Sequence, residues 1–320
     1  MSNLLRGSVG AAAAMFLVGT LAAISAVINR YPLYGGQALR YTLAALILVA
    51  VARAVGLALV RPTGRELVLL LALAATGLVL FNLCVIQATR HASATLVGTV
   101  IGTVPVVLAL VGPLLARSRP SGRVLVAASV VVAGATITTG VGSGSLTGLL
   151  YAVGALACEA CFSLLAIPLL PRLGPIRVSA YTQAIAVPML LLLGAVVDGP
   201  GMLRVPTAAE AAALVYLSTV VSAGAFFLWY DALPRLGADR AGLFAGVLPL
   251  GAIVTSVLLG LGTPTATELA GATVVVAGLA VGLAPRRSRF PAGDPVGAGD
   301  LVSSSAGELD PDPSRLGGPA

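Results

Sequence analysis

Two charged residues stand inside otherwise apolar stretches of the chain and could carry chemistry there. Glu159 lies in "LACEACFS", near the centre of the apolar run 146–170, and Arg40 lies in "GGQALRYTL". On insertion scales a charge at the centre of a membrane helix costs about 2.5–3.5 kcal/mol, so neither side chain should face lipid. A carboxyl group held away from water can take up and release a proton as its surroundings change. Glu159 is therefore the first candidate for a proton or substrate site.

Arg40 is the candidate partner of Glu159. Arg40 lies seven residues past Leu33 and Glu159 eleven past Gly148, which places them roughly 10 Å and 16 Å below the same membrane surface at 1.5 Å per residue. Long side chains can span that difference, so an ion pair is geometrically allowed. The alternative is structural: Arg40 reaches towards the surface or caps a carbonyl group, and a protonated Glu159 forms a hydrogen bond within the bundle.

Other polar residues at membrane depth are Asn82, Tyr181 and Gln183. We predict that they contribute to a substrate site, with plain hydrogen bonding between helices as the alternative for Asn82 and Gln183. Trp229 and Tyr230 end the apolar segment 208–230, which predicts an aromatic anchor at the membrane surface. The spacing of Cys158 and Cys161 is interpreted as helix packing. His91 is the only histidine, so we expect no histidine-based metal site and no cofactor.

The composition indicates that a lipid bilayer surrounds these residues. Of 320 residues, 58% are hydrophobic and 10% are charged, and the mean hydropathy is +1.02. Soluble domains carry roughly 25% charged residues, so this much apolar surface requires lipid. The three cysteines all lie in apolar runs, which excludes a secreted disulfide framework. The net charge of +7 comes without basic clusters interleaved with aromatic residues, so no nucleic-acid partner is expected.

Ten apolar segments are long enough to span a bilayer. They cover approximately residues 7–28, 33–53, 67–88, 93–115, 122–140, 147–170, 176–197, 208–230, 239–260 and 268–284. Residues 286–320 are rich in Pro, Gly, Ser and Asp without apolar periodicity, which predicts a disordered cytoplasmic tail.

The segments form an internal repeat. Residues 64–105 align with 208–249 without a gap, which matches Glu66 with Glu210 and Pro105 with Pro249. We therefore expect an all-α membrane protein made of two five-helix repeats, 1–140 and 146–285. Because five is odd, the second repeat must be inverted relative to the first.

The arginine residues predict which side of the membrane each loop occupies. With a cytoplasmic N-terminus, the outer side holds only Arg30, Arg90 and Arg204, and most of the other arginines fall on the inner side: Arg6, Arg53, Arg61, Arg65, Arg117, Arg119, Arg123, Arg172, Arg177, Arg235, Arg240, Arg286, Arg287 and Arg289. Both termini are therefore predicted to be cytoplasmic.

The repeat also predicts a pair of gate helices. The fourth and ninth segments each carry two glycines four residues apart and a proline three residues later, namely Gly98, Gly102, Pro105 and Gly242, Gly246, Pro249. Small residues at this spacing let helix backbones approach closely, and a proline allows a helix to bend. Simple helix packing is the other interpretation, and the two are compatible.

Several stretches resemble a known family. The sequences "PLYGGQALRYTLAALIL", "SATLVGTVIGTVPVVLAL" and "RSRPSGRVLVAASVVVAGATI", together with ten segments in two halves, resemble the EamA family of the drug/metabolite transporter superfamily. The resemblance covers about residues 7–285 and implies transport, usually export, of small metabolites, amino acids or drugs. In the first segment, "MFLVGTLAAIS" lacks the Trp-Gly pair that is common in the family.

The residues alone lead to a compatible function. Inverted repeats place a substrate path at their interface, and rocking of one half against the other gives alternating access. We expect a secondary active transporter of the bacterial inner membrane, a proton-coupled exporter whose partners are a small-molecule substrate and the lipid bilayer. The alternatives are a channel, a structural membrane protein or, with less support from the short loops, a membrane-embedded enzyme. The sequence leaves monomer and homodimer open.

Overall fold

The computed structural model describes residues 3–25, 28, 30–260 and 263–284, and this part of the chain is helical without a regular strand. Within it, ten helical spans are long and apolar enough to cross a membrane. The chain is therefore an all-helical multi-pass membrane protein, as the composition predicted. The predicted tail, 286–320, lies outside the described residues.

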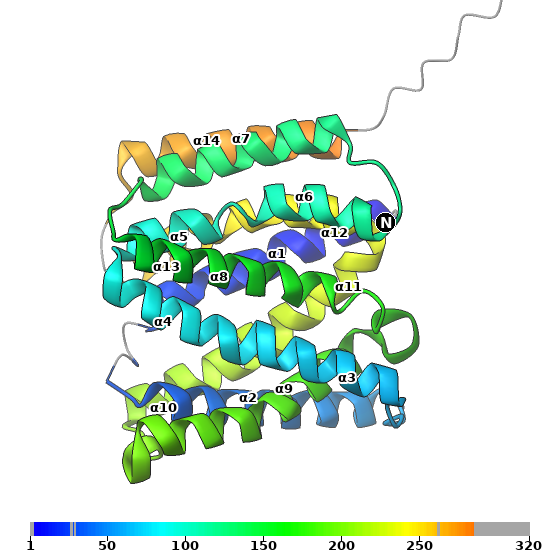
Figure 1. The fold of residues 1–320 in the computed structure, drawn as a ribbon, viewed down its shortest axis with the longest axis vertical. Helices are drawn as coiled ribbons and strands as arrows, with labels where there is room; N and C mark the ends of the chain where they lie inside the picture. The colour runs from blue at the N-terminus through cyan, green and yellow to red at the C-terminus, as the bar shows by residue number, and fades with distance from the viewer. Residues whose placement is uncertain (1–2, 26–27, 29, 261–262, 285–320) are drawn as a thin grey trace, which may run out of the picture. The chain divides into compact units, whose positions relative to one another are not determined.

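The ten spans follow one another in chain order (Figure 1). They are α1 (Asn3–Ser25); α2 (Leu33–Ala54); α3 (Gly64–Leu73), η1 (Ala74–Leu80) and α4 (Phe81–His91) as one span; α5 (Ala94–Ile101) with α6 (Val104–Leu115); α7 (Gly122–Thr139); α8 (Leu146–Leu164); α9 (Leu170–Val197); α10 (Ala208–Tyr216), η3 (Leu217–Ala225) and α11 (Phe226–Leu236) as one span; α12 (Ala238–Leu243), η4 (Phe244–Val247) and α13 (Leu248–Leu258) as one span; and α14 (Ala266–Leu283). The short η2 (Gly199–Met202) follows α9.

The third and eighth spans begin in the same way. Thr63 and Thr207 each accept a hydrogen bond from the backbone of a glutamate three residues later, and that glutamate bonds back to the threonine backbone. These capping boxes satisfy backbone N–H groups that the first helical turn leaves free. The two glutamates are Glu66 and Glu210, the pair that the sequence alignment had matched.

The same two spans are also interrupted at matching positions. The π-helical segments η1 and η3 lie in the middle of the third and the eighth span. A π-helical turn contains an extra residue, so it changes the direction in which the following side chains point. The interruptions therefore decide which residues of these spans face the interior.

The contacts between spans follow the same pattern in the first five spans and in the last five. Helix α7 packs along α14, and α2 packs along α9, at opposite edges of Figure 1. Helix α1 contacts α11 and α13 of the eighth and ninth spans, while α8 contacts α4 and α5 of the third and fourth. An inverted repeat would produce this pattern, and the repeat with its two domains stays a prediction that the pattern favours.

Helices α7 and α14 approach each other closely because glycines face glycines. A β-carbon added to Gly271 would lie 2.6 Å from the carbonyl oxygen of Gly134, and one added to Gly134 would lie 2.8 Å from that of Gly271. Real β-carbons do not approach backbone atoms this closely. The contact is therefore a small-residue interface of the kind that joins helices in lipid.

One expectation from the sequence is wrong. The eighth span continues to Leu236, so Trp229 and Tyr230 lie inside the bundle, 3% and 0% exposed, and do not form a surface anchor. The apolar segment 208–230 was expected to end at Tyr230. In the structure, Arg235 Nη2 donates to Asp231 Oδ1 at 2.7 Å, one turn apart on the same helix, so the helix can continue past them.

Candidate functional site

Arg40 lies in the middle of α2 and is buried, with 5% of its surface exposed. Its Nε donates to Oγ of Ser222 in η3 at 2.6 Å, and its Nη1 donates to Oε1 of Gln37 at 3.4 Å. The guanidinium carbon lies 5.4 Å from the centroid of the Tyr41 ring. The ion pairs between described residues all involve other arginines. Arg40 is therefore held inside the bundle by uncharged partners.

The contacts of Arg40 extend into a polar network across four spans. Gln37 Nε2 lies 3.5 Å from Asn82 Oδ1, and Asn82 Nδ2 donates to the carbonyl oxygen of Leu78 at 2.6 Å. On the other side, Gln183 Nε2 donates to the carbonyl oxygen of Ser222 at 3.0 Å. We call Gln37, Arg40, Asn82, Gln183 and Ser222 the Arg40 network. It brings together three residues that the sequence had singled out, Arg40, Asn82 and Gln183.

Two members of the network were missed in the sequence. Gln37 precedes Arg40 by three residues, which places both on one face of a helix, so its role could have been predicted. Ser222 lies 182 residues from Arg40 in a run of small residues, "STVVSAGA". Its direction depends on the π-helical segment η3, and the hydropathy pattern gives no sign of that segment.

Glu159 lies on the face of α8 that points into the bundle, which we call the inward stripe of α8. Ala155, Phe162 and Ser163 lie three or four residues away on the same face and are buried. The stripe meets α11, where Phe162 packs on Tyr230 with ring centroids 5.3 Å apart. Glu159 itself stays partly exposed although these neighbours are buried.

The expected pair between Arg40 and Glu159 is not formed in the described contacts. Arg40 instead donates to Ser222 and Gln37, while Glu159 lies on the face of α8 whose Phe162 packs against Tyr230. The two side chains therefore have separate surroundings in this structure. An Arg40–Glu159 pair stays a prediction for another access state.

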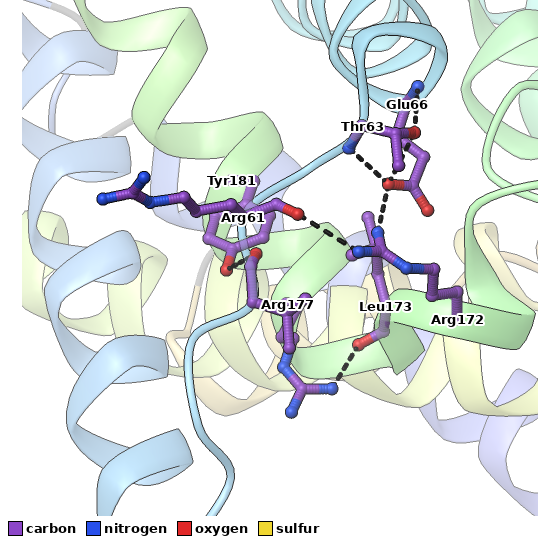
Figure 2. A network of polar contacts seen from close by, with 8 residues as sticks. Arg61, Thr63, Glu66, Arg172, Leu173, Arg177 and Tyr181 are labelled. Atoms are coloured by element: carbon purple, nitrogen blue, oxygen red, sulfur yellow. Dashed lines mark hydrogen bonds and ion pairs between the residues drawn. The ribbon is translucent and has the colours of Figure 1, made fainter.

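Tyr181 lies apart from the Arg40 network. Its hydroxyl group donates to the carbonyl oxygen of Val60 at 2.8 Å, in the connection between α2 and α3 (Figure 2). Arg177 Nε donates to the carbonyl oxygen of Ala58 at 2.9 Å, and Arg172 Nη2 donates to that of Arg61 at 3.2 Å. Tyr181 therefore helps to fix a loop at one end of the bundle.

Arg172 also forms an ion pair with Glu66, the capping residue of α3. Figure 2 shows Arg172 between Glu66 and Arg61. We call this group the Arg172 clip, because it joins the connection 58–63 to the start of α9. It links segments that belong to different halves in the predicted repeat.

A comparable cluster surrounds Glu210, the matching capping residue of α10. Arg204 forms an ion pair with Glu210, and its Nη2 donates to the carbonyl oxygen of Arg30 at 3.4 Å. Tyr31 donates from its hydroxyl group to the carbonyl oxygen of Arg204 at 2.6 Å. We call this the Arg204 clip. It joins the connection before α2 to the connection before α10.

The two prolines of the predicted gates begin helices after an interruption. Pro105 lies in the first turn of α6 and Pro249 in the first turn of α13, where a missing N–H group needs no partner. Before Pro105, Gly102 N donates to Gly98 O at 2.8 Å as α5 ends, and before Pro249 the chain forms the 3₁₀ segment η4. Both spans are interrupted at positions that the alignment matches. Their role as gates stays a prediction.

The glycines of the two gates differ. A β-carbon on Gly242 would lie 2.9 Å from Cβ of Leu108, and one on Gly246 would lie 2.4 Å from Cγ1 of Val131. A β-carbon on Gly98 would have no neighbour within 4 Å. The packing interpretation therefore accounts for Gly242 and Gly246 and does not account for Gly98.

Two of the cysteines lie on helices that pack together, Cys84 on α4 and Cys158 on α8. Both thiols are buried. Among the described residues, no group of three potential metal ligands of the His, Cys, Asp or Glu type occurs.

Comparison with known proteins agrees with this architecture. The model of the EamA-like transporter family matches the chain twice, at residues 5–140 and 146–283. The uncharacterized transporter YetK of Bacillus subtilis is 25% identical over 256 residues, which is 78% of each chain. A solved crystal structure at 19% identity aligns with a TM-score of 0.71 over 88% of this chain and 97% of its own, which shows a shared fold. The chain thus belongs to the EamA-like transporter family, which makes it a multi-pass membrane transporter.

Proposed function

We propose that this transporter is a proton-coupled exporter of small molecules in the bacterial inner membrane. Glu159 would bind either a proton or a cationic group of the substrate in alternation. The observation that carries the proposal is the position of Glu159 on the inward stripe of α8, where it stays partly exposed while its neighbours are buried. It is the one acidic residue at mid-span in the described part of the chain. A lone carboxyl group in this setting is a functional-site candidate by default.

Alternating access is supported by the reciprocal helix contacts and by the matched interruptions. The first and sixth spans each pack across to the other half, and the fourth and ninth spans are interrupted at matching places. Two halves related in this way can rock around a central site. Interruptions of the hydrogen-bond ladder give the fourth and ninth spans places at which they can bend.

The Arg172 and Arg204 clips would regulate opening at the two ends. Each joins segments of different predicted halves through one arginine, a capping glutamate and backbone carbonyl groups. If the halves separate at one end, the clip there must release. The partly exposed arginines allow this, because water can replace their partners.

The decisive test replaces Glu159 by Gln in purified protein reconstituted into proteoliposomes. The transported solute is first identified by comparing the metabolites of medium and cytoplasm with and without the protein. Glu159→Gln retains the shape and hydrogen bonding of the side chain but cannot titrate. We expect it to lose accumulation driven by a pH gradient and to retain exchange of labelled against unlabelled solute.

Glu268→Gln is the matched control. Glu268 lies at the start of α14 in a capping box with Thr265, and glutamine can replace glutamate there. It should behave as wild type. If Glu159→Gln accumulates solute with the pH dependence of the wild type, Glu159 is a structural group and the proton-coupling proposal fails. If the wild-type protein does not exchange labelled for unlabelled solute, a channel is favoured instead, because only a carrier exchanges substrate for substrate.

A further inference from the structure

We infer that Arg40 is the anchor for a singly charged carboxylate group of the substrate. The inference rests on the proposed transport function and names the chemical class of its substrate. Arginine remains protonated in proteins, and a buried charge is costly unless it is paired. The described partners of Arg40 are the uncharged Ser222, Gln37 and Tyr41.

Other buried polar atoms beside the network also lack partners. Ser179 Oγ, Thr182 Oγ1 and Gln183 Oε1 on α9 are buried without a hydrogen bond to any described group. Ser179 and Gln183 lie one turn apart on the same face, and Gln183 is joined to Arg40 through Ser222. Buried polar groups are rarely unsatisfied. The α9 side of the Arg40 network therefore has more buried polar atoms than partners among the described residues.

The two ends of the guanidinium group are held differently. The Nε end donates to Ser222 at 2.6 Å, a short bond to a fully buried hydroxyl group. The Nη1 end is 3.4 Å from Gln37, and Gln37 is 3.5 Å from Asn82, both at the limit of hydrogen bonding. The firm end orients Arg40. The loosely held end can exchange Gln37 for a stronger acceptor.

The loosely held end is also the accessible one. Gln37 and Asn82 are partly exposed, whereas Ser222 and Gln183 are fully buried. A ligand would therefore reach Arg40 from the side of the two amides. Their N–H groups could then donate to the second oxygen of an anion.

A carboxylate fits this arrangement better than a phosphate group. A guanidinium group makes two parallel bonds to a carboxylate. Arg40 is the one basic residue at mid-span among the described residues. A phosphate ester carries nearly two charges, and the second would stay buried without a cation. The geometry of one guanidinium group and two amides therefore points to a monoanionic carboxylate.

The test measures thermal unfolding of the whole purified protein in nanodiscs of uncharged lipid. Acetate serves as the probe because it is a small monovalent carboxylate that fits wherever a larger one binds. Its uncharged analogue acetamide, chloride and inorganic phosphate are compared at matched concentration. We expect acetate to raise the unfolding midpoint of the wild type above that in acetamide or chloride. No such rise, or a larger rise with phosphate, overturns the inference.

Arg40→Gln should abolish the rise in acetate. Arg53→Gln is the matched control, because Arg53 lies exposed in the last turn of the same helix, and it should retain the full rise. If Arg40→Gln does not fold, Arg40→Lys replaces it: the ammonium group cannot make two parallel bonds, so the rise should fall. An unchanged rise in Arg40→Gln or in Arg40→Lys refutes the anchor.

The outcome is separable from that of the proposed function. Glu159-dependent transport without an Arg40-dependent effect of acetate refutes the carboxylate anchor alone. An Arg40-dependent effect of acetate in a protein that neither accumulates nor exchanges any solute refutes the transport proposal and leaves the anion site standing.

Discussion

The hydrogen bond from Arg40 to Ser222 should make the largest single contribution to the stability of the Arg40 network. Ser222→Ala removes the hydroxyl group that accepts the hydrogen bond from the charged Arg40 side chain, and both residues are buried. Hydrogen bonds to charged groups contribute about 1.5–3 kcal/mol, whereas pairs between membrane helices average about 0.6 kcal/mol and reach about 1.7 kcal/mol. Because the donor is cationic and the distance is 2.6 Å, we expect about 1.5 kcal/mol, at the upper end of the membrane range.

A double-mutant cycle isolates this contribution. Ser222→Ala is measured in the wild type and in an Arg40→Met background, in which the serine no longer has a charged donor. Ser222→Ala should lower the free energy of unfolding in the wild type and hardly change it in the Arg40→Met background. The difference between the two changes is the coupling energy. Unfolding in mixed micelles can be followed through Trp229, which is the only tryptophan. It is buried and donates to Ser163 at 3.3 Å, so its fluorescence reports on the core.

Ser218→Ala provides the matched control for the cycle. Ser218 lies in the same segment η3 and is fully buried, but its hydroxyl group donates to Leu214 O of its own span at 2.6 Å. Ser218→Ala should lower the free energy of unfolding by the same amount in both backgrounds. A coupling of less than about 0.5 kcal/mol between Ser222 and Arg40, below the average neutral pair, would refute the reasoning and leave Arg40 held by other contacts.

Two further predictions concern topology and gating. A reporter that is active only in the cytoplasm should give signal when fused to residue 320 or inserted at 116–121, and none when inserted at 141–144; a silent fusion at 320 in membrane-inserted protein contradicts the inverted repeat. Pro105→Ala and Pro249→Ala should lower transport more than they lower the amount of folded protein, because alanine lets the fourth and ninth spans continue as regular helices. Normal transport by both variants would place the gates elsewhere.

The sequence alone determined the class of protein and the number of spans. In lipid each backbone polar group must be satisfied within its own segment, so every span is a long apolar helix that can be recognised locally. The same argument gave the depths of Arg40 and Glu159, because rise per residue is constant along a helix. Arg40, Asn82 and Gln183 could be selected as polar residues at depth for this reason.

Only the tertiary structure decided which of these side chains meet. Hydropathy gives the position of a residue along the membrane normal and leaves open its direction around the helix axis. That direction depends on neighbouring helices and on the π-helical segment η3, which turns Ser222 towards Arg40. Glu159 and Arg40 both lie at mid-span and yet form no ion pair in the described contacts, and Tyr181 donates to Val60 at one end of the bundle. Trp229 and Tyr230 are buried because the span continues past them to Leu236.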